Sequence, residues 1–312
     1  MKRIFYIILL LFAFSSCEYE FPIDMGVEDA KLILHSTVNE DSHLVLGLNT
    51  ATPVDKHSSS SKQKLQLENL SITLNDTPLQ MEDYSYANVL GMKYMRSLHS
   101  VRSGDVIKIK AKAVGAKEVE AETIVPSKPK VTSVSLDTLR AINNIFGELS
   151  LLYMKIGIEN INSDDVLMMK IRYIAMTEDE DGSPVAMTRS IVPSDAGKSV
   201  IRCPYDGISF MGTSIEDDYF FVPASVIKNG VLEFISDFYF KDFDTNTCID
   251  VYAYKVSDSF YYYGRSLYMQ SENFLSELGF SAPNMSYSNV KNGLGVLGAV
   301  SEVEVYTLRG NK

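Results

Sequence analysis

The chain has 312 residues, of which 46% are hydrophobic and 22% charged, and its formal net charge is −11. This composition is that of a globular protein with one or two buried cores, and it rules out a disordered or collagen-like chain. Because phosphate binding depends on basic patches that release counterions, the acidic balance argues against nucleic acid as a partner. It also argues against adsorption onto anionic lipid through a basic helix.

The first sixteen residues have the pattern of a signal peptide. Lys2 and Arg3 supply a short positive start, and no acidic residue follows them before Cys17. Residues 4–14 form an apolar run that is too short to cross a bilayer core of about 30 Å. We therefore expect residues 1–16 to be a cleaved export signal.

The end of this signal indicates a lipid anchor. Ser15 and Ser16 are small residues directly before Cys17, and the triplet resembles the lipobox at which bacterial lipoprotein signals are cut. Diacylation of Cys17 would hold the mature chain stably on a membrane, because two acyl chains bury enough CH₂ groups. Residues 17–28 would then be a lipidated linker. Ordinary secretion, with Cys17 as a simple thiol, is the alternative.

An acidic segment, residues 18–20, follows at once and contains two glutamates. It resembles the surface-export signal of Bacteroidetes lipoproteins, which predicts an outer-membrane protein that faces the cell exterior. The alternative is a solvated linker whose charges have no role in export.

From Lys31 onwards the hydrophobic period is mostly two, which is typical of β-strands. Residues 32–37 and 43–48 alternate on either side of a polar turn at 39–42 and predict a hairpin. Six or seven short strands at this spacing predict an immunoglobulin-like β-sandwich over residues 29–126. Further strands are expected at 70–74, 106–111 and 119–124, the last with Glu120 and Glu122 pointing outwards.

Two prolines in a short segment mark the boundary between domains. Pro126 and Pro129 each disfavour helix before them and remove a backbone donor from any sheet. We therefore expect a second β-rich domain over residues 127–312, with a hairpin turn at Asp181-Gly182. Its strands are predicted at 131–136, 152–158, 166–176, 231–240, 249–256 and 300–308, and the odd positions of 166–176 form the more apolar face.

One segment of the second domain has helical periodicity. Apolar residues between about 258 and 278 recur at helical steps, Ser257 or Asp258 can cap the start, and Gly279 can close the end. We expect a helix laid on the second sheet. Its aromatic run, residues 260–269, could form a binding stripe, but rings at helical spacing predict core packing instead.

Gly293, Gly295 and Gly298 match the dinucleotide-binding pattern G-x-G-x-x-G, but their context does not. A nucleotide-binding loop follows a strand and opens a helix. Here the glycines follow a turn-like segment and lead into an alternating strand. We interpret Asn292-Gly293 as a turn and the later glycines as points of close backbone or helix packing.

Cys203 and Cys248 are the remaining cysteines, and in an oxidising compartment they can form one disulfide. Closing a loop of about 45 residues would stabilise the fold by roughly 4 kcal/mol. Two separately buried thiols are an equal alternative, because the distance between the two residues cannot be read from sequence. Neither cysteine has the spacing of a metal or redox motif.

No segment has the full signature of a metal or catalytic site. Residues 242–246 open like a calcium loop, but Thr247 stands where such a loop needs glycine, so a hairpin turn is expected. A zinc site shared by His35 and His43 is a minor alternative to structural roles. We expect no cofactor, no metal and no catalytic residues, although paired carboxylates from distant strands would leave no local signature.

The carboxy-terminal part of the chain carries a family resemblance. Residues 261–267, which read YYYGRSL, are followed by Pro283 and by the run SNVKNGLGVLG at 288–298. With the lipobox and the β-rich first domain, these segments resemble the Bacteroidetes outer-membrane lipoproteins of the "domain of unknown function 4249" family. Leu297 stands where an aromatic residue is expected. The resemblance supplies no catalytic residues.

The resemblance implies a role in nutrient capture, because family members tend to be encoded beside TonB-dependent outer-membrane receptors. We therefore expect a ligand-binding or accessory lipoprotein of such a receptor. A structural or adhesive surface protein is the first alternative, and a hydrolase is the second. Peptide, glycan and metal complex are equal candidates for the cargo.

Overall fold

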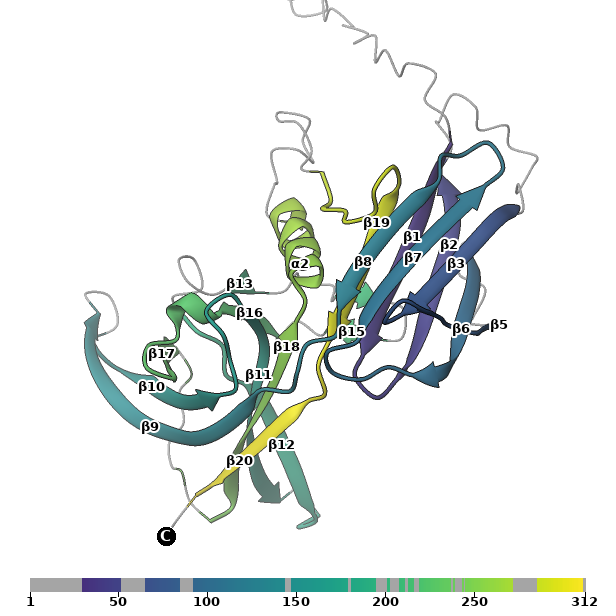
Figure 1. Ribbon diagram of the computed structural model, residues 1–312. Coiled ribbons are helices and arrows are strands. Elements are labelled where there is room, and N and C mark those ends of the chain that lie inside the picture. The colour runs from purple at the N-terminus through teal and green to yellow at the C-terminus, as the bar shows by residue number, and fades with distance from the viewer. Residues whose placement is uncertain are drawn as a thin grey trace, which may run out of the picture.

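The computed structural model describes residues 30–51, 65–84, 92–143, 147–178, 181–194, 201–202, 208–210, 213–215, 219–236, 238, 243, 245–271 and 285–310. This part of the chain is mainly β, as the sequence predicts, and it contains one α-helix towards the carboxy terminus (Figure 1). The strands form two halves that share one long sheet.

The N-terminal half consists of two sheets packed face to face. Its strands are β1 (Lys31–Asn39), β2 (His43–Ala51), β3 (Leu67–Leu74), β4 (Thr77–Pro78), β5 (Met81–Asp83), β6 (Lys93–Ser100), β7 (Val106–Ala113), β8 (Val119–Ile124) and β19 (Leu294–Val300). One sheet has the order β19-β1-β2-β6-β5, and the other has the order β4-β3-β7-β8. Leu34, Leu46 and Ile109 are fully buried between them. Each such side chain stabilises the fold by about 1.5–3 kcal/mol.

The C-terminal half repeats this two-layer plan. Its strands are β9 (Lys130–Asn143), β10 (Gly147–Glu159), β11 (Val166–Glu178), β12 (Pro184–Ser190), β13 (Ile201–Arg202), β16 (Phe220–Pro223), β17 (Val231–Ser236), β18 (Thr247–Val256) and β20 (Glu304–Arg309), with a 3₁₀ turn η2 (Ala224–Val226). A small hairpin of β14 (Ile208–Phe210) and β15 (Thr213–Ile215) contacts β1 of the N-terminal half. The sheet β17-β10-β9 covers one face of β16, β11 and β18. Ile156, Met169 and Val251 are fully buried in this core. Figure 1 shows the strong curvature of the β9–β10 hairpin.

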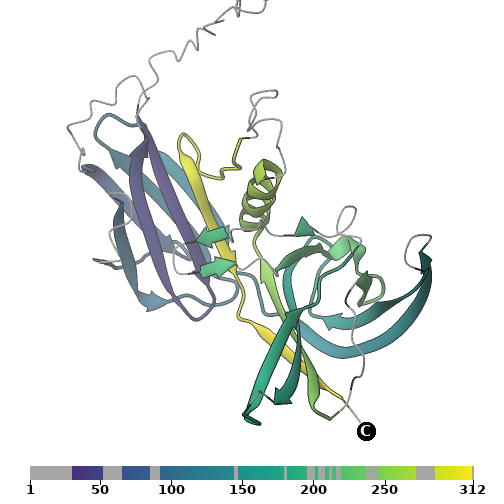
Figure 2. The ribbon, with the colours of Figure 1, turned by 180° about the vertical axis from the view of Figure 1, so that it is seen from behind.

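A single sheet connects the two halves. β18 pairs with β11 on one side and with β20 on the other, and at Val256 it also meets Val300 of β19. β19 in turn runs parallel to β1. The helix α2 (Asp258–Ser271) lies where the two halves join (Figures 1 and 2). Its Phe260 packs in a third core with Met168 and Val296.

The third core lies on the opposite side of the long sheet from the cores of the two halves. Met168 and Val296 alternate along their strands with Met169 and Leu297, which belong to those cores. Successive residues of a strand point to opposite faces. We call the side of the long sheet that holds α2 the α2 face.

Several predicted elements are confirmed. In β11 the odd positions from Leu167 to Ala175 point into the core, and in β8 Glu120 and Glu122 point away from it. The predicted helix begins at Asp258, and Ser257 caps it, because its Oγ accepts the Phe260 N–H at 3.3 Å. The expected end of the helix at Gly279 lies outside the described residues.

The prediction of one strand over residues 300–308 is wrong. The chain forms β19 up to Val300, leaves the strand conformation, and resumes as β20 at Glu304. At the break, the Ser301 hydroxyl accepts the Lys255 N–H at 2.9 Å, and the Ser301 N–H donates to the Lys255 carbonyl at 2.8 Å. The segment changes partner here, from β1 of the first half to β18 of the second. It therefore ties the two halves together.

The glycine motif is a packing device, as the sequence predicts. Gly295 has φ +106°, and a Cβ there would lie 2.0 Å from the Leu34 carbonyl oxygen. A Cβ on Gly298 would meet Phe260 of α2 at 3.0 Å. The Asn289 side chain holds the preceding loop, because it both accepts from and donates to the backbone of Leu297 at 2.9 Å. Small residues thus let β19 fit between β1 and α2.

Candidate functional site

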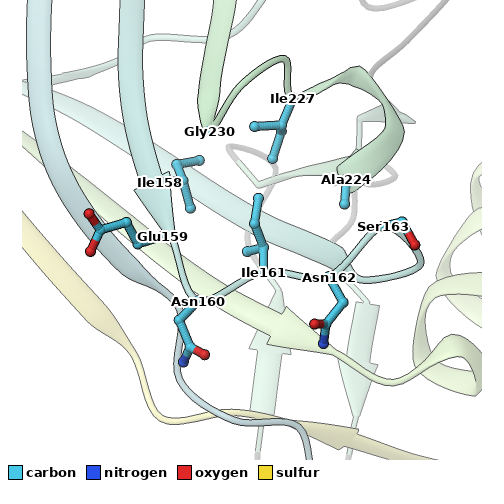
Figure 3. A pocket seen from close by; sticks show the side chains of 9 residues that line it. All are labelled: Ile158, Glu159, Asn160, Ile161, Asn162, Ser163, Ala224, Ile227 and Gly230. Atoms are coloured by element: carbon cyan, nitrogen blue, oxygen red, sulfur yellow. The ribbon is translucent and has the colours of Figure 1, made fainter.

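Two hollows lie beside the turn that carries η2 and leads into β17. The first has a volume of 320 Å³, and Ile158, Ile161 and Ile227 form its apolar walls (Figure 3). Figure 3 shows the Glu159 carboxylate and the Asn160 amide directed away from these walls. The Asn160 amide also donates to the Lys128 carbonyl. Asn162 and Ser163 also line this hollow, so it presents polar groups beside the apolar walls.

The second hollow has a volume of 620 Å³, and Glu233 is the one carboxylate among the described residues that line it. The Tyr153 hydroxyl donates to Glu233 at 2.7 Å, and the Lys155 ammonium lies 3.3 Å from its other oxygen. These contacts, Tyr153 first, lower the pKa of Glu233. A general acid for glycoside hydrolysis needs a raised pKa and a second carboxylate opposite. The lining residues that the structure describes supply neither.

The α2 face carries an arginine whose buried Nε has no hydrogen-bond partner in the part of the chain that the structure describes. Arg172 of β11 is half-buried, and its guanidinium carbon lies 4.9 Å from the centroid of the Tyr252 ring. An unsatisfied buried donor costs about 1–3 kcal/mol. Cation–π contact with Tyr252 recovers only part of this, about 0.5–2 kcal/mol.

A second cation lies next to Arg172 on the same face. Lys170 is 3% exposed, and its ammonium is 5.2 Å from the centroid of the Tyr219 ring. The Tyr219 ring is itself 6.0 Å from Tyr254 on β18. Lys170 stands opposite Tyr252 in the β11–β18 ladder. We call Lys170, Arg172, Tyr219, Tyr252 and Tyr254 the cation–tyrosine cluster.

The N-terminal half contributes buried polar groups to the α2 face. His35 of β1 packs edge-on against Tyr263 of α2, with ring centroids 6.1 Å apart. Burial lowers the pKa of His35 and raises that of Tyr263, so both side chains favour their neutral forms. The Thr37 hydroxyl is buried on this face and has no hydrogen-bond partner among the described residues.

The predicted cysteine sites are only partly within the described chain. Cys17, the predicted lipidation site, and Cys203 lie outside it, so the lipid anchor and the disulfide stay predictions. Cys248 lies half-buried on β18, and desolvation raises the pKa of its thiol. None of the helices that the structure describes is long and apolar enough to span a membrane.

The metal alternatives receive no support from the described residues. His35 stands opposite Gly47 in the β1–β2 ladder, whereas the His43 ring bonds to the Ser97 carbonyl at 2.7 Å. Asp242 and Asp244 of the calcium-like segment lie outside the description, while Thr245 and Asn246 form a turn. Within the described ranges no group of three or more potential ligands is close enough to hold a metal ion.

Sequence reasoning did not single out the cation–tyrosine cluster. The alternation in β11 correctly assigned Lys170 and Arg172 to the less apolar face, which is usually solvated. The sequence does contain a signal for this cluster. Lys170 and Arg172 lie two positions apart in one strand, and a later strand has tyrosines at 252 and 254. The absence of a polar partner for the Arg172 Nε depends on side-chain geometry that periodicity does not describe.

Comparison with known proteins places the chain in a family. A search of curated proteins gave no match. A family model described as "Domain of unknown function (DUF4249)" matches residues 18–305, which is most of the chain. The match covers both halves of the long sheet and the glycine motif that joins them. The chain therefore belongs to the DUF4249 family.

Proposed function

We propose that this protein is a surface-exposed outer-membrane lipoprotein that binds a ligand for, or acts as an accessory to, a TonB-dependent nutrient receptor. The observation that carries the proposal is the lipobox-like Ser15-Ser16-Cys17 and its place relative to the family match. That match begins at residue 18, directly after the cysteine that would become the lipidated amino terminus. The part of the chain that the family model matches thus begins where the expected mature protein begins.

The fold is consistent with a binding role. β1 begins at Lys31, soon after the proposed anchor, and pairs directly with β19. Because β19 continues into β20, the anchored half is coupled through paired strands to the half that carries the hollows and the cation–tyrosine cluster. Such coupling suits a protein that presents a ligand in a fixed orientation to a membrane receptor.

We also propose that the N-terminal sandwich is immunoglobulin-like. The strand orders β1-β2-β6-β5 and β4-β3-β7-β8 correspond to the A-B-E-D and C′-C-F-G sheets of that fold. β19 then adds an extra parallel strand at the edge beside β1. An experimental structure of this half with another connectivity would refute the assignment.

The lipid anchor is tested by metabolic labelling with a palmitate analogue. The wild-type protein is expected to incorporate the label and to fractionate with outer membranes, whereas Cys17→Ser is expected to lose both properties. Cys248→Ser is the matched control, because Cys248 lies within β18. Equal labelling of wild type and Cys17→Ser would refute the anchor. Protease treatment of intact cells then tests whether the anchored protein faces the exterior.

The receptor partnership is tested by affinity purification of the tagged protein from outer membranes in mild detergent. Mass spectrometry is expected to recover one TonB-dependent receptor at near-equal amount. Recovery of the lipoprotein without a receptor would contradict a stable complex. It would favour the structural or adhesive surface protein as the second candidate.

A further inference from the structure

Arg172 carries a positive charge for which the described residues provide no ion pair. Its guanidinium is stacked on Tyr252, which fixes its orientation, and its buried Nε lacks a hydrogen-bond partner among the described residues. Asp250 stands opposite Arg172 in the ladder, but no ion pair joins the two in the described structure. The Asp250 carboxylate accepts instead from the Thr307 hydroxyl at 2.6 Å. A half-buried guanidinium that is held in one orientation and lacks an ion pair can bind the oxygen atoms of an external ligand.

The residues around Arg172 indicate the shape of a ligand as well as its charge. Lys170 lies two positions earlier on the same face, with its ammonium over the Tyr219 ring. Tyr219 and Tyr254 pack against each other, and Tyr252 stands opposite Lys170 in the ladder with the Arg172 guanidinium over its ring. Tyrosine rings offer flat apolar surface together with hydroxyl groups. The cluster therefore combines a fixed cationic fork with flat surfaces beside it.

We infer that the cation–tyrosine cluster is a binding site for an organic carboxylate. The Arg172 fork takes the two carboxylate oxygens, and the ring-shaped body of the ligand lies on the tyrosines. Sugar acids and aromatic acids share this chemistry. The inference deepens the proposed function, because it rests on a ligand-binding role and names the class of ligand.

The balance of charge favours a singly charged ligand. Asp250 stands opposite Arg172 and carries a negative charge. At close range it would repel a phosphate dianion more strongly than a carboxylate with a single charge. A planar carboxylate also matches the guanidinium fork in a bidentate geometry.

The test is isothermal titration of the full chain, purified from membranes in detergent, with galacturonic acid, benzoate and inorganic phosphate. The wild type is expected to bind one or both carboxylates and to bind phosphate more weakly. Preference between the two carboxylates distinguishes a sugar acid from an aromatic acid. Arg172→Lys keeps the charge but loses the fork, and it is expected to weaken carboxylate binding by about tenfold. Arg172→Gln is expected to abolish it.

Arg189→Gln is the matched control, because Arg189 is an exposed arginine on the neighbouring strand β12. It is expected to bind like the wild type. Failure of the wild type to bind either carboxylate, stronger binding of phosphate, or equal affinity of Arg172→Gln and wild type would each overturn the inference. None of these results bears on palmitate labelling or receptor co-purification, so the site and the proposed function can fail separately.

Discussion

Strand β7 of the N-terminal half and strand β11 of the C-terminal half differ in how the charges on their polar faces are paired. In the N-terminal half, three lysines of β7 each pair with a carboxylate, Lys108 with Asp76, and Lys110 and Lys112 with Glu120 and Glu68. In the C-terminal half, the Arg172 guanidinium of β11 stacks on the Tyr252 ring, and its Nε has no hydrogen-bond partner among the described residues. The lysines of β7 are thus neutralised within the fold, whereas Arg172 keeps a donor for which the described chain provides no acceptor. This difference agrees with our proposal that the recognition site lies in the C-terminal half.

The largest expected effect concerns the strand that joins the two halves. Gly295→Val should lower the free energy of unfolding by about 4 kcal/mol or more. The reason is that Gly295 has φ +106° and a Cβ there would lie 2.0 Å from the Leu34 carbonyl oxygen. Urea unfolding followed by circular dichroism measures the loss. Gly104→Ala, at a positive φ in open space, should cost only about 1–2 kcal/mol. Similar losses for both variants would contradict the tight docking of β19.

The next largest loss of stability is expected for a change in α2, where the helix packs against the junction of the two halves. Phe260→Ala should destabilise the protein by about 3–5 kcal/mol, because Phe260 is fully buried between α2 and the long sheet. Thermal and urea unfolding report the change. Tyr262→Ala, on the same helix but 45% exposed, should cost about 1 kcal/mol through lost ring contacts. If unfolding of Phe260→Ala splits into two transitions, the two halves are coupled mainly through this core.

A substitution in the loop before β19 should reduce stability by a smaller amount. Asn289→Ala removes hydrogen bonds to both backbone groups of Leu297 and a third, at 3.3 Å, to the Glu122 carbonyl. The expected cost is about 2–3 kcal/mol. Asn69→Ala, at an exposed position of β3, should change stability by less than about 0.5 kcal/mol. A cost for Asn289→Ala as small as that of the control would show that the glycines alone position β19.

The pH dependence of stability should reflect His35 at the boundary between the halves. Burial lowers the pKa of His35 in the folded protein, so the unfolded chain binds this proton more readily. Stability should therefore fall as the pH drops through the ordinary histidine value of about 6.5 towards the lower folded pKa. Unfolding curves across this range should be less acid-sensitive for His35→Gln than for wild type. The exposed His99→Gln serves as the control, and an unchanged profile for His35→Gln would contradict the prediction.

The smallest effects concern the difference in charge pairing between β7 and β11. Arg172→Met should leave stability unchanged or raise it by up to about 1 kcal/mol, because it removes a buried donor without a polar partner. Lys110→Met should instead cause a small loss that high salt removes, because it breaks an exposed ion pair. Denaturant unfolding at low and high salt measures both variants. A clear loss for Arg172→Met would show that its charge serves the fold.

The sequence by itself determined the local structure of this protein. Apolar residues occupy every second position of β11, and also Ile107 and Ile109 of β7, because one face of each strand is buried. A period of two can be recognised from consecutive residues alone. Ser257 and the helical spacing after it likewise determined where α2 begins. The turn-like segment before the glycines at 293–298 and the strand after them excluded a nucleotide-binding loop and predicted close packing, which the structure shows at Gly295 and Gly298.

Only the tertiary structure decided how distant segments meet. The pairing of β19 with β1 joins residues more than 250 positions apart through backbone hydrogen bonds, and such bonds do not depend on which side chains are present. The glycines that make this pairing possible also made β19 difficult to predict from the sequence, because glycine has low strand propensity. The unpartnered state of the Arg172 Nε is likewise a tertiary property. It depends on the register that places Asp250 and Tyr252 beside Arg172, and residue periodicity along a single strand does not specify that register.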